Sequence, residues 1–270
     1  MALDNYGRVW YSGSYKIDGK VQKTNSFICI NNVSGTEFYN ACQADENLKI
    51  KDIQIFDRSY VLTDTNSDTW VFGDNYHGQL GNGTKSTISE LYCISKDLGI
   101  KIKKIGMYKT AYSVSTIILD TEGNIWTCGG PDSSTSAQNY YYGITGSATM
   151  KTTPTKILET MTGITDFYAT GECVFAYGEN AVWAWGRNDY GQLGLGYQTG
   201  GTAYYIPLKN KLVYVPQKIS SEFTIEKISQ YYYTTYAIDT TGKVWTWGQS
   251  GNSATPYIKP TCISDDTTEG

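Results

Sequence analysis

Long apolar runs, histidine and charge are all scarce in this sequence of 270 residues. No stretch approaches the ~18 uninterrupted apolar residues of a membrane helix, and the first residues lack the basic-then-apolar pattern of an export signal. We therefore expect no membrane insertion. The single histidine, His77, and six cysteines without a Cys-x-x-Cys pair cannot form a zinc set of normal spacing, so we expect neither metal nor other cofactor.

The low charge bears on the class of partner. Charged residues make up 18% of the chain, the net charge is -4, and Lys and Arg are dispersed singly. Because nucleic-acid binders usually carry a basic patch, we do not expect a nucleic-acid partner. The 24 tyrosines must supply much of the polar surface. Such a surface suits reversible contact with proteins, or alternatively with glycans, and favours an extracellular, cell-surface or viral-assembly context over a cytoplasmic one.

An internal repeat of about 60 residues runs through the chain. Five short segments each place a Trp three positions before a Gly, and these glycines are separated by 60, 56, 57 and 62 residues. Alternation of aromatic residues with β-branched or small ones predicts a strand in each segment. The repeated residues are Trp10, Trp70, Trp126, Trp183 and Trp245, followed by Gly13, Gly73, Gly129, Gly186 and Gly248.

Each repeat predicts four short strands. Asp-x-x-Gly at residues 4–7, 120–123 and 239–242 predicts a tight hairpin before the Trp strand. A strand-like stretch precedes four of the glycines by 19 to 24 residues, and another short strand follows the Trp strand. No 12-residue stretch has helical periodicity. These features predict an all-β fold, namely a β-propeller of about five four-stranded antiparallel blades.

We expect residues 1–270 to form a single β-propeller domain. Its approximate repeat units are 1–13 (partial), 14–73, 74–129, 130–186, 187–248 and 249–270 (partial). The chain opens on the third strand of a unit and stops on the first, which leaves it one strand short of a closed ring. Either one blade has three strands, or the chain is an open arc or fragment of a larger propeller, and we favour the latter.

Two segments resemble a known repeat. Residues 74–83 read Asp-Asn-Tyr-His-Gly-Gln-Leu-Gly-Asn-Gly, residues 187–196 read Arg-Asn-Asp-Tyr-Gly-Gln-Leu-Gly-Leu-Gly, and both directly follow a Trp strand. The order of turn, aromatic strand, Gly-Gln-Leu-Gly and Pro resembles the regulator of chromosome condensation repeat family, in a bacterial or viral-type member. The resemblance implies a propeller, commonly of seven blades. The Gly-x-x-His-Ser that usually precedes the third strand is missing here.

Strand parity sorts the predicted loops onto two faces of the disc. One face receives the loops between second and third strands and those leading to the next unit, and it is rich in tyrosine. Because tyrosine is enriched in protein-binding surfaces, we expect this face to bind the partner. The alternative is that many of these rings pack between blades. The candidate contact residues are Tyr60, Tyr108, Tyr112, Tyr140, Tyr141, Tyr142, Tyr204, Tyr205, Tyr231, Tyr232 and Tyr233.

No set of residues in the sequence suggests a catalytic site. His77 lies in a Gly-rich turn with no Ser/Asp constellation, and residues 191–196 precede no helix that could hold a phosphate. We therefore predict a non-enzymatic scaffold for protein–protein interaction. The alternatives are a lectin-like carbohydrate-binding surface protein, a structural subunit of a surface or viral assembly, and, from the family resemblance, a guanine-nucleotide exchange factor for a small GTPase.

Overall fold

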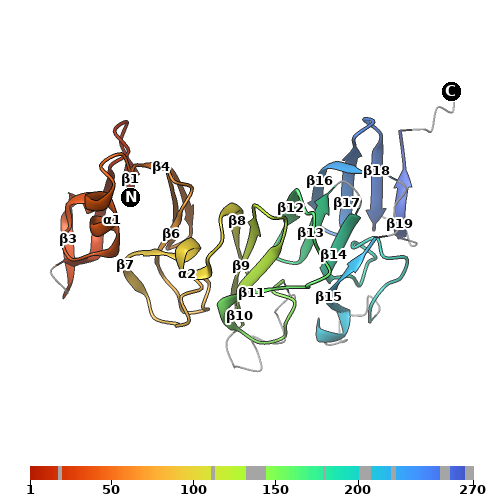
Figure 1. Ribbon diagram of the computed structural model, residues 1–270. Helices are drawn as coiled ribbons and strands as arrows, with labels where there is room; N and C mark the ends of the chain where they lie inside the picture. The colour runs from red at the N-terminus through yellow and green to blue at the C-terminus, as the bar shows by residue number, and fades with distance from the viewer. Residues whose placement is uncertain are drawn as a thin grey trace.

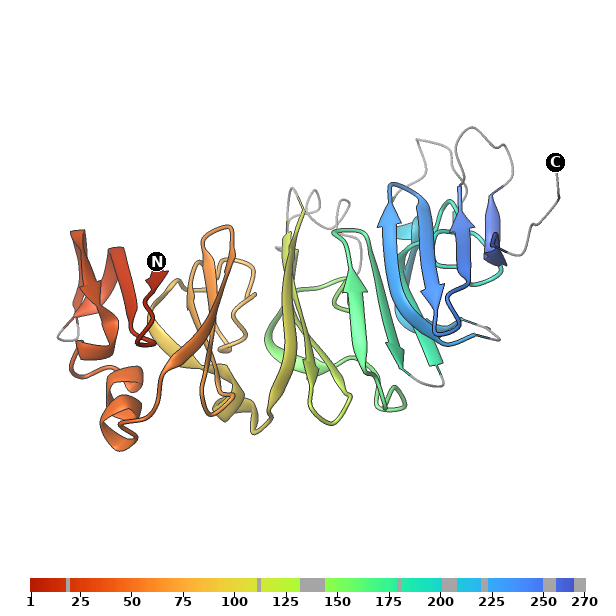
Figure 2. The same cartoon turned by 90° about the horizontal axis from the view of Figure 1, so that it is seen from above.

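The computed structural model describes residues 1–17, 20–110, 113–131, 144–178, 181–200, 208–219, 223–249 and 256–264. Within these ranges the strands form five antiparallel sheets that follow one another along the chain (Figure 1). In Figures 1 and 2 the sheets fan into an open arc, with the N-terminal sheet at one end and the C-terminal sheet at the other. The expected all-β architecture is confirmed.

The first sheet has three strands and the other four sheets have four strands each, as far as the described residues go. The first sheet contains β1 (Ala2–Leu3), β2 (Val9–Ile17) and β3 (Lys20–Cys29). The second contains β4 (Ile50–Phe56), β5 (Ser59–Asp64), β6 (Thr69–Gly73) and β7 (Ile88–Cys93). The third contains β8 (Ile102–Lys109), β9 (Ser113–Asp120), β10 (Ile125–Pro131) and β11 (Lys151–Lys156). The fourth contains β12 (Asp166–Ala169), β13 (Cys173–Gly178), β14 (Ala181–Arg187) and β15 (Leu212–Lys218). The fifth contains β16 (Ile225–Tyr231), β17 (Thr234–Asp239), β18 (Val244–Gly248) and β19 (Tyr257–Cys262).

The repeat glycines allow each Trp strand to pair with the first strand of the next repeat unit. Gly73, at the end of β6, has φ +107°, and the β6–β7 register shifts between Val71 and Gly73. A Cβ at Gly73 or Gly186 would collide with the carbonyl oxygen of Arg58 or Glu172, respectively. Each four-stranded sheet therefore joins three strands of one unit to one strand of the next unit, and this β-ladder connects the units.

The Asp-x-x-Gly turn is held by the tryptophan that follows it. In the fifth sheet, Asp239 Oδ1 accepts from the backbone nitrogens of Thr241 and Lys243, and Oδ2 accepts from Trp245 Nε1 at 2.8 Å. The pairs Asp4–Trp10 and Asp120–Trp126 repeat this arrangement. So do Asp64 and Trp70, in a turn where Ser67 takes the positive φ of +60° in place of glycine. The repeated aspartate is thus a structural acceptor for the hairpin.

Apolar side chains fill the spaces between neighbouring sheets. All six residues of β13 are buried, because the third and fifth sheets cover its two faces. Phe175 packs with Trp247 of the fifth sheet at 6.1 Å between ring centroids. The matching strand of the last sheet, β17, instead leaves Tyr236 and Ile238 43% and 41% exposed. Sheet-to-sheet packing therefore forms the core.

Short helical segments interrupt the β-structure. The helix α1 (Glu37–Ala44) begins after Thr36, whose side chain accepts a hydrogen bond from the backbone nitrogen of Tyr39, and it packs Phe38 edge-on against Trp70. The helix α2 (Ile94–Leu98) follows β7, and 3-10 turns occupy η1 (Ile30–Asn32) and η2 (Leu208–Lys211). No helix in the described ranges is long and apolar enough to cross a membrane.

Candidate functional site between the second and third sheets

The two Gly-Gln-Leu-Gly segments lie in loops that connect neighbouring sheets. In the first loop, the side-chain oxygen Oε1 of Gln79 accepts from the backbone nitrogen of His77 at 3.0 Å. The backbone carbonyl of Gln79 accepts from Thr116 Oγ1 of the third sheet at 2.7 Å. In the second loop, the side-chain oxygen Oε1 of Gln192 accepts from the backbone nitrogen of Tyr190 at 2.8 Å. The backbone carbonyl of Gln192 accepts from Thr235 Oγ1 of the fifth sheet at 2.8 Å. The two loops therefore share one hydrogen-bonded scaffold, and their glutamines stabilise contacts between sheets.

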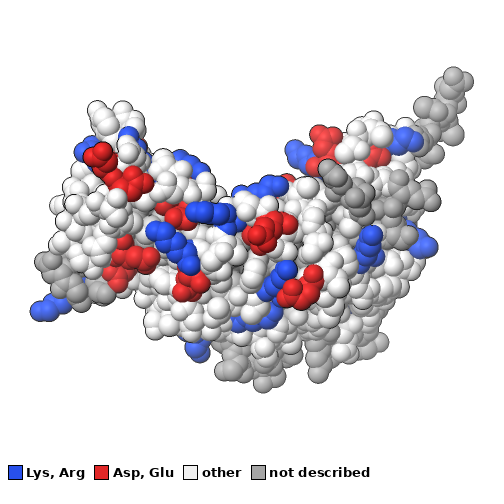
Figure 3. All heavy atoms as spheres, in the orientation of Figure 1, with Lys and Arg blue, Asp and Glu red and all other residues white. Residues whose placement is uncertain are grey.

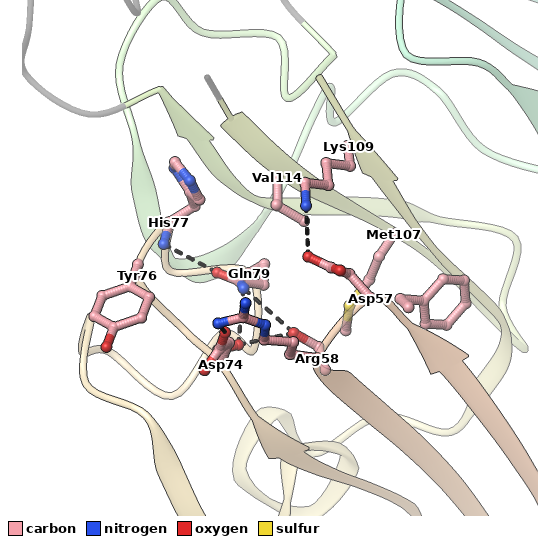
Figure 4. Close-up of a pocket in the computed structure, with 11 residues that line it drawn as sticks. Asp57, Arg58, Asp74, Tyr76, His77, Gln79, Met107, Lys109 and Val114 are labelled. Carbon is pink, nitrogen blue, oxygen red and sulfur yellow. Dashed lines mark hydrogen bonds and ion pairs between the residues drawn. The ribbon is translucent and has the colours of Figure 1, made fainter. Parts of the chain in front are cut away.

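A cavity of about 560 Å³ opens beside the first loop, between the second and third sheets (Figure 4). The β4–β5 turn, the loop after β6 and the β8–β9 hairpin supply its walls. This volume falls within the usual range of ligand pockets. We call it the open pocket, and its lining residues are Phe56, Asp57, Arg58, Ser59, Asp74, Tyr76, His77, Gln79, Met107, Lys109 and Val114.

Two ion pairs lie in the walls of the open pocket. Lys109 Nζ reaches from the third sheet to Asp57 Oδ2 of the second sheet at 2.5 Å, and this hydrogen bond lowers the pKa of Asp57. Arg58 is held more loosely, with its NH1 3.8 Å from Asp74 Oδ2 and its side chain 78% exposed. Figure 4 shows Arg58 and Asp74 together on one side of the pocket and the Lys109–Asp57 pair on another.

Apolar and aromatic groups complete the open pocket. Met107 is buried, and Phe56 and Val114 are half-buried, so the pocket has apolar surface below its charged groups. Tyr76 is 66% exposed. His77 Nδ1 lies 3.2 Å from the carbonyl oxygen of Gly130, and because a carbonyl only accepts, this contact assigns the proton to Nδ1. The pocket can thus offer donors, acceptors and an apolar contact to one ligand.

The matching place between the fourth and fifth sheets is occupied by side chains. Arg187 makes two hydrogen bonds to Asp189, of 2.7 and 3.0 Å, and contacts Glu172 at 3.3 Å. Lys211 Nζ lies 3.1 Å from the same Asp189. The tyrosine rings at this place stack with 4.1 Å between centroids, and the Arg187 guanidinium lies 4.7 Å from one of them. We call this the filled site, and its residues are Glu172, Arg187, Asp189, Tyr190, Lys211 and Tyr233.

Burial and charge act together on Arg187 in the filled site. The Arg187 side chain is 12% exposed and the Asp189 side chain is fully buried. Burial by itself would lower the pKa of Arg187, but the hydrogen bonds to Asp189 and the charge of Glu172 outweigh it and raise that pKa. Arg187 therefore stays protonated, and its guanidinium is hydrogen-bonded within the site.

A backbone hydrogen bond identifies the corresponding positions of the two sites. The Asp74 nitrogen donates to the Arg58 carbonyl at 3.0 Å, and the Arg187 nitrogen donates to the Glu172 carbonyl at 2.9 Å. Arg58 of the open pocket therefore corresponds to Glu172 of the filled site, and Asp74 corresponds to Arg187. The charges at these two positions are reversed between the sites. Two positions further along the loop, Tyr76 stands where the filled site has Asp189.

The tyrosines singled out from the sequence have different surroundings. Tyr231 and Tyr232 are each 72% exposed and meet edge to face, whereas Tyr233 is half-buried in the filled site. Tyr60 packs against Phe72 in the core between the first and second sheets. Tyr108 packs between the third and fourth sheets, where burial raises its pKa to about 12. The remaining candidates lie outside the described residues: Tyr112, Tyr140, Tyr141, Tyr142, Tyr204 and Tyr205.

None of the charged residues of the open pocket was among the sequence candidates. Strand parity places residues 57–58 and 74–79 on the same face as Tyr231 and Tyr232, but parity cannot show that Lys109 crosses to Asp57. His77 was set aside as a turn residue, and the structure places it in the pocket. Within the described ranges, no group of three or more His, Cys, Asp or Glu side chains could hold a metal ion.

The sheets and their Gly-Gln-Leu-Gly connections define a β-propeller arc. The family model for the Regulator of chromosome condensation (RCC1) repeat matches residues 179–231, which include β14, the second Gly-Gln-Leu-Gly loop, β15 and β16. The resemblance expected from the sequence is confirmed.

Solved structures with the same fold cover most of the chain. Human WBSCR16 is 16% identical with a TM-score of 0.58, over 80% of this chain and 52% of that one. Prp20p from Saccharomyces cerevisiae is 13% identical with a TM-score of 0.57, over 98% of this chain and 61% of that one. Yeast RCC1 (Prp20), solved with Kap60, is 14% identical with a TM-score of 0.57, over 97% of this chain and 61% of that one. This chain thus spans 52 to 61% of the length of these chains, and at such identities the likeness establishes the fold.

Proposed function

We propose that this chain is a non-enzymatic protein-binding scaffold whose contact surface is the loop face that carries Tyr76, Tyr231, Tyr232 and the open pocket. The observation that carries the proposal is the exposure of these three rings, 66 to 72%, on the face into which a cavity of about 560 Å³ opens. Exposed aromatic side chains beside a pocket are the usual anchors of protein interfaces. Figure 3 shows the other side of the molecule, on which α1 and α2 lie and where Lys and Arg are interspersed with Asp and Glu. That side is not the proposed contact surface.

The choice of first partners to test comes from the structural relatives. The structure of Prp20p was described together with its binding properties to Gsp1p and histones. A small GTPase of the Gsp1p type and a core histone are therefore the first two purified proteins to offer to this chain. With the GTPase, faster release of bound nucleotide would favour the exchange-factor version of the proposal.

The test compares two faces of the same molecule. Immobilised chain is offered the GTPase and the histone, and binding is measured for wild type, for the double variant Tyr231→Ser/Tyr232→Ser, and for Tyr6→Ser. Tyr6 is a matched control because it is 64% exposed in the β1–β2 turn, which parity places on the opposite face. We expect the double variant to weaken binding by at least about tenfold and Tyr6→Ser to leave it unchanged.

Equal binding by all three proteins would contradict the proposed contact surface. Signals on a glycan array without binding to either protein would replace the scaffold by the lectin alternative. Circular dichroism and thermal unfolding of each variant check that the fold is intact, since exposed side chains should contribute little to stability.

A further inference from the structure

The two sites treat their arginines differently. In the filled site Arg187 faces two carboxylates, from Asp189 and Glu172, and is 12% exposed. In the open pocket Arg58 faces one carboxylate, that of Asp74, at the loose distance of 3.8 Å, and is 78% exposed. The charge of Arg58 also helps to lower the pKa of Asp57, but no second hydrogen bond or ion pair joins its guanidinium to a side chain among the described residues. An arginine offers five N–H donors in a planar fork, so most of the donors of Arg58 remain for a ligand.

The carboxylate of Asp189 in the filled site has no counterpart at its position in the open pocket. The position of Asp189 is taken by Tyr76, whose ring is 66% exposed. The other acid of the pocket, Asp57, is held by Lys109 at 2.5 Å. The scaffold is the same in both sites and each has two carboxylates, but in the open pocket neither carboxylate is in tight contact with the arginine, and about 560 Å³ of space lies next to it.

We propose that the open pocket receives a carboxylate from the protein partner, an Asp or Glu side chain whose apolar neighbour rests on Phe56, Met107 and Val114. Arg58 donates to this carboxylate, while the ammonium of Lys109 offsets the charge of Asp57, which would otherwise repel it. The inference rests on the proposed protein-binding function and names the chemistry of the group that is bound. A guanidinium fork matches a carboxylate in two parallel hydrogen bonds, which are stronger than neutral ones.

A basic side chain fits the same pocket less well. Asp57 and Asp74 each already face a cation, at 2.5 and 3.8 Å. In each pair the cation is the more exposed partner, with side-chain exposures of 78% for Arg58 against 28% for Asp74, and 59% for Lys109 against 54% for Asp57. An incoming ammonium or guanidinium would therefore meet the cations first, and the repulsion would oppose its binding. The pocket therefore distinguishes acidic from basic residues in the partner.

A methionine in the pocket wall provides a direct probe. The chain has four methionines, of which Met107 lines the open pocket and Met161 is fully buried elsewhere. The full chain is labelled with 13C at the methionine methyls, and the Met107 signal is assigned with Met107→Leu. Three capped tripeptides are then titrated, acetyl-Leu-Glu-Leu-amide and its Gln and Lys versions, together with the Gln version bearing a free C-terminal carboxylate.

We expect the Glu peptide to shift the Met107 methyl and leave Met161 unchanged, with a dissociation constant at least about tenfold lower than that of the Gln or Lys peptide. Arg58→Gln should remove this preference, so that the Glu and Gln peptides bind equally. Lys23→Gln, which removes the same charge from exposed β3 in the first sheet, should keep it. If the Gln peptide with a free C-terminal carboxylate binds more tightly than the Glu peptide, the conclusion that the pocket receives a side-chain carboxylate is overturned.

The proposal is overturned if the Lys or Gln peptide binds as well as the Glu peptide, if Arg58→Gln keeps the preference, or if no peptide shifts Met107. These results differ from a failure of the scaffold itself. The scaffold fails when the Tyr231→Ser/Tyr232→Ser variant binds its partner as well as wild type does, which can occur whatever the pocket prefers.

Discussion

The open pocket and the filled site are built on the same loop, but one is a cavity and the other is closed by side chains. In both, the side chain of a Gln accepts a hydrogen bond from a backbone nitrogen of the turn, and the backbone carbonyl of the same Gln accepts from a threonine hydroxyl of the next sheet. The difference comes from the positions around this scaffold. Tyr233 and Arg187 fill one site, whereas Val114 and Asp74 occupy the matching register in the other. A repeat can therefore keep its connections between sheets while the side chains beside them create or remove a binding site.

The largest expected effect comes from breaking the filled site. Asp189→Ala leaves the buried cations Arg187 and Lys211 without their shared anion, and we expect it to lower the free energy of unfolding by about 3–5 kcal/mol. Asp74→Ala in the open pocket removes only a loose, exposed contact and should cost less than about 1 kcal/mol. Urea denaturation of both variants measures the difference. Equal losses would refute the distinction between the two sites.

The shared scaffold predicts equal effects from its glutamines. Gln79→Ala and Gln192→Ala each remove a buried side chain that accepts from a backbone nitrogen, and each should lower the free energy of unfolding by about 1–3 kcal/mol. The measurement is again urea denaturation. A large loss in one variant with none in the other would show that the loops are not equivalent.

Filling the open pocket should affect binding more than stability. Val114→Tyr places at the third sheet the residue type that the filled site has at Tyr233, and we expect the Met107 methyl to lose its response to the Glu peptide. Stability should change by less than about 1.5 kcal/mol, since Val114 borders a cavity that can accept the ring. A normal titration of Met107 in this variant would place the binding site elsewhere.

The smallest expected effect concerns the charge of Asp57. Its hydrogen bond from Lys109 holds the pKa of Asp57 below the ordinary value. As the pH falls, the pair therefore persists through the ordinary value and is lost only at the lowered pKa. In Lys109→Gln the pKa of Asp57 should rise back toward the ordinary range, which a carboxyl-carbon NMR titration measures. The urea midpoint at neutral pH should stay unchanged, because the pair is exposed. An unchanged pKa would mean that Lys109 does not contact Asp57 in solution.

The sequence alone predicted the repeat and the sheets well, because these depend on short-range patterns. Gly73 and Gly186 mark bulges where a Cβ would meet a carbonyl oxygen, and a tryptophan three positions earlier marks the same strand in each unit. The first sheet has three strands among the described residues, in agreement with a chain that opens on the third strand of a unit. The short helices are below the length at which periodicity can be recognised.

The candidate site was harder to predict than the fold. Parity groups the loops by face, but it could not distinguish Tyr60, which packs on Phe72, from Tyr231, which is exposed. Their different burial depends on which sheet packs against each hairpin, and that is a property of the assembled arc. Charged turn residues such as Arg58 have no sequence signature of their own.

The sequence by itself thus determined the all-β repeat, its turns and its connecting loops, because hydrogen bonds and φ requirements act over a few residues. Only the tertiary structure decided that one loop borders a pocket and the other a closed ion network. The reason is that Asp57 and Lys109 stand 52 residues apart and meet across two sheets, so the pocket exists only once those sheets have packed together.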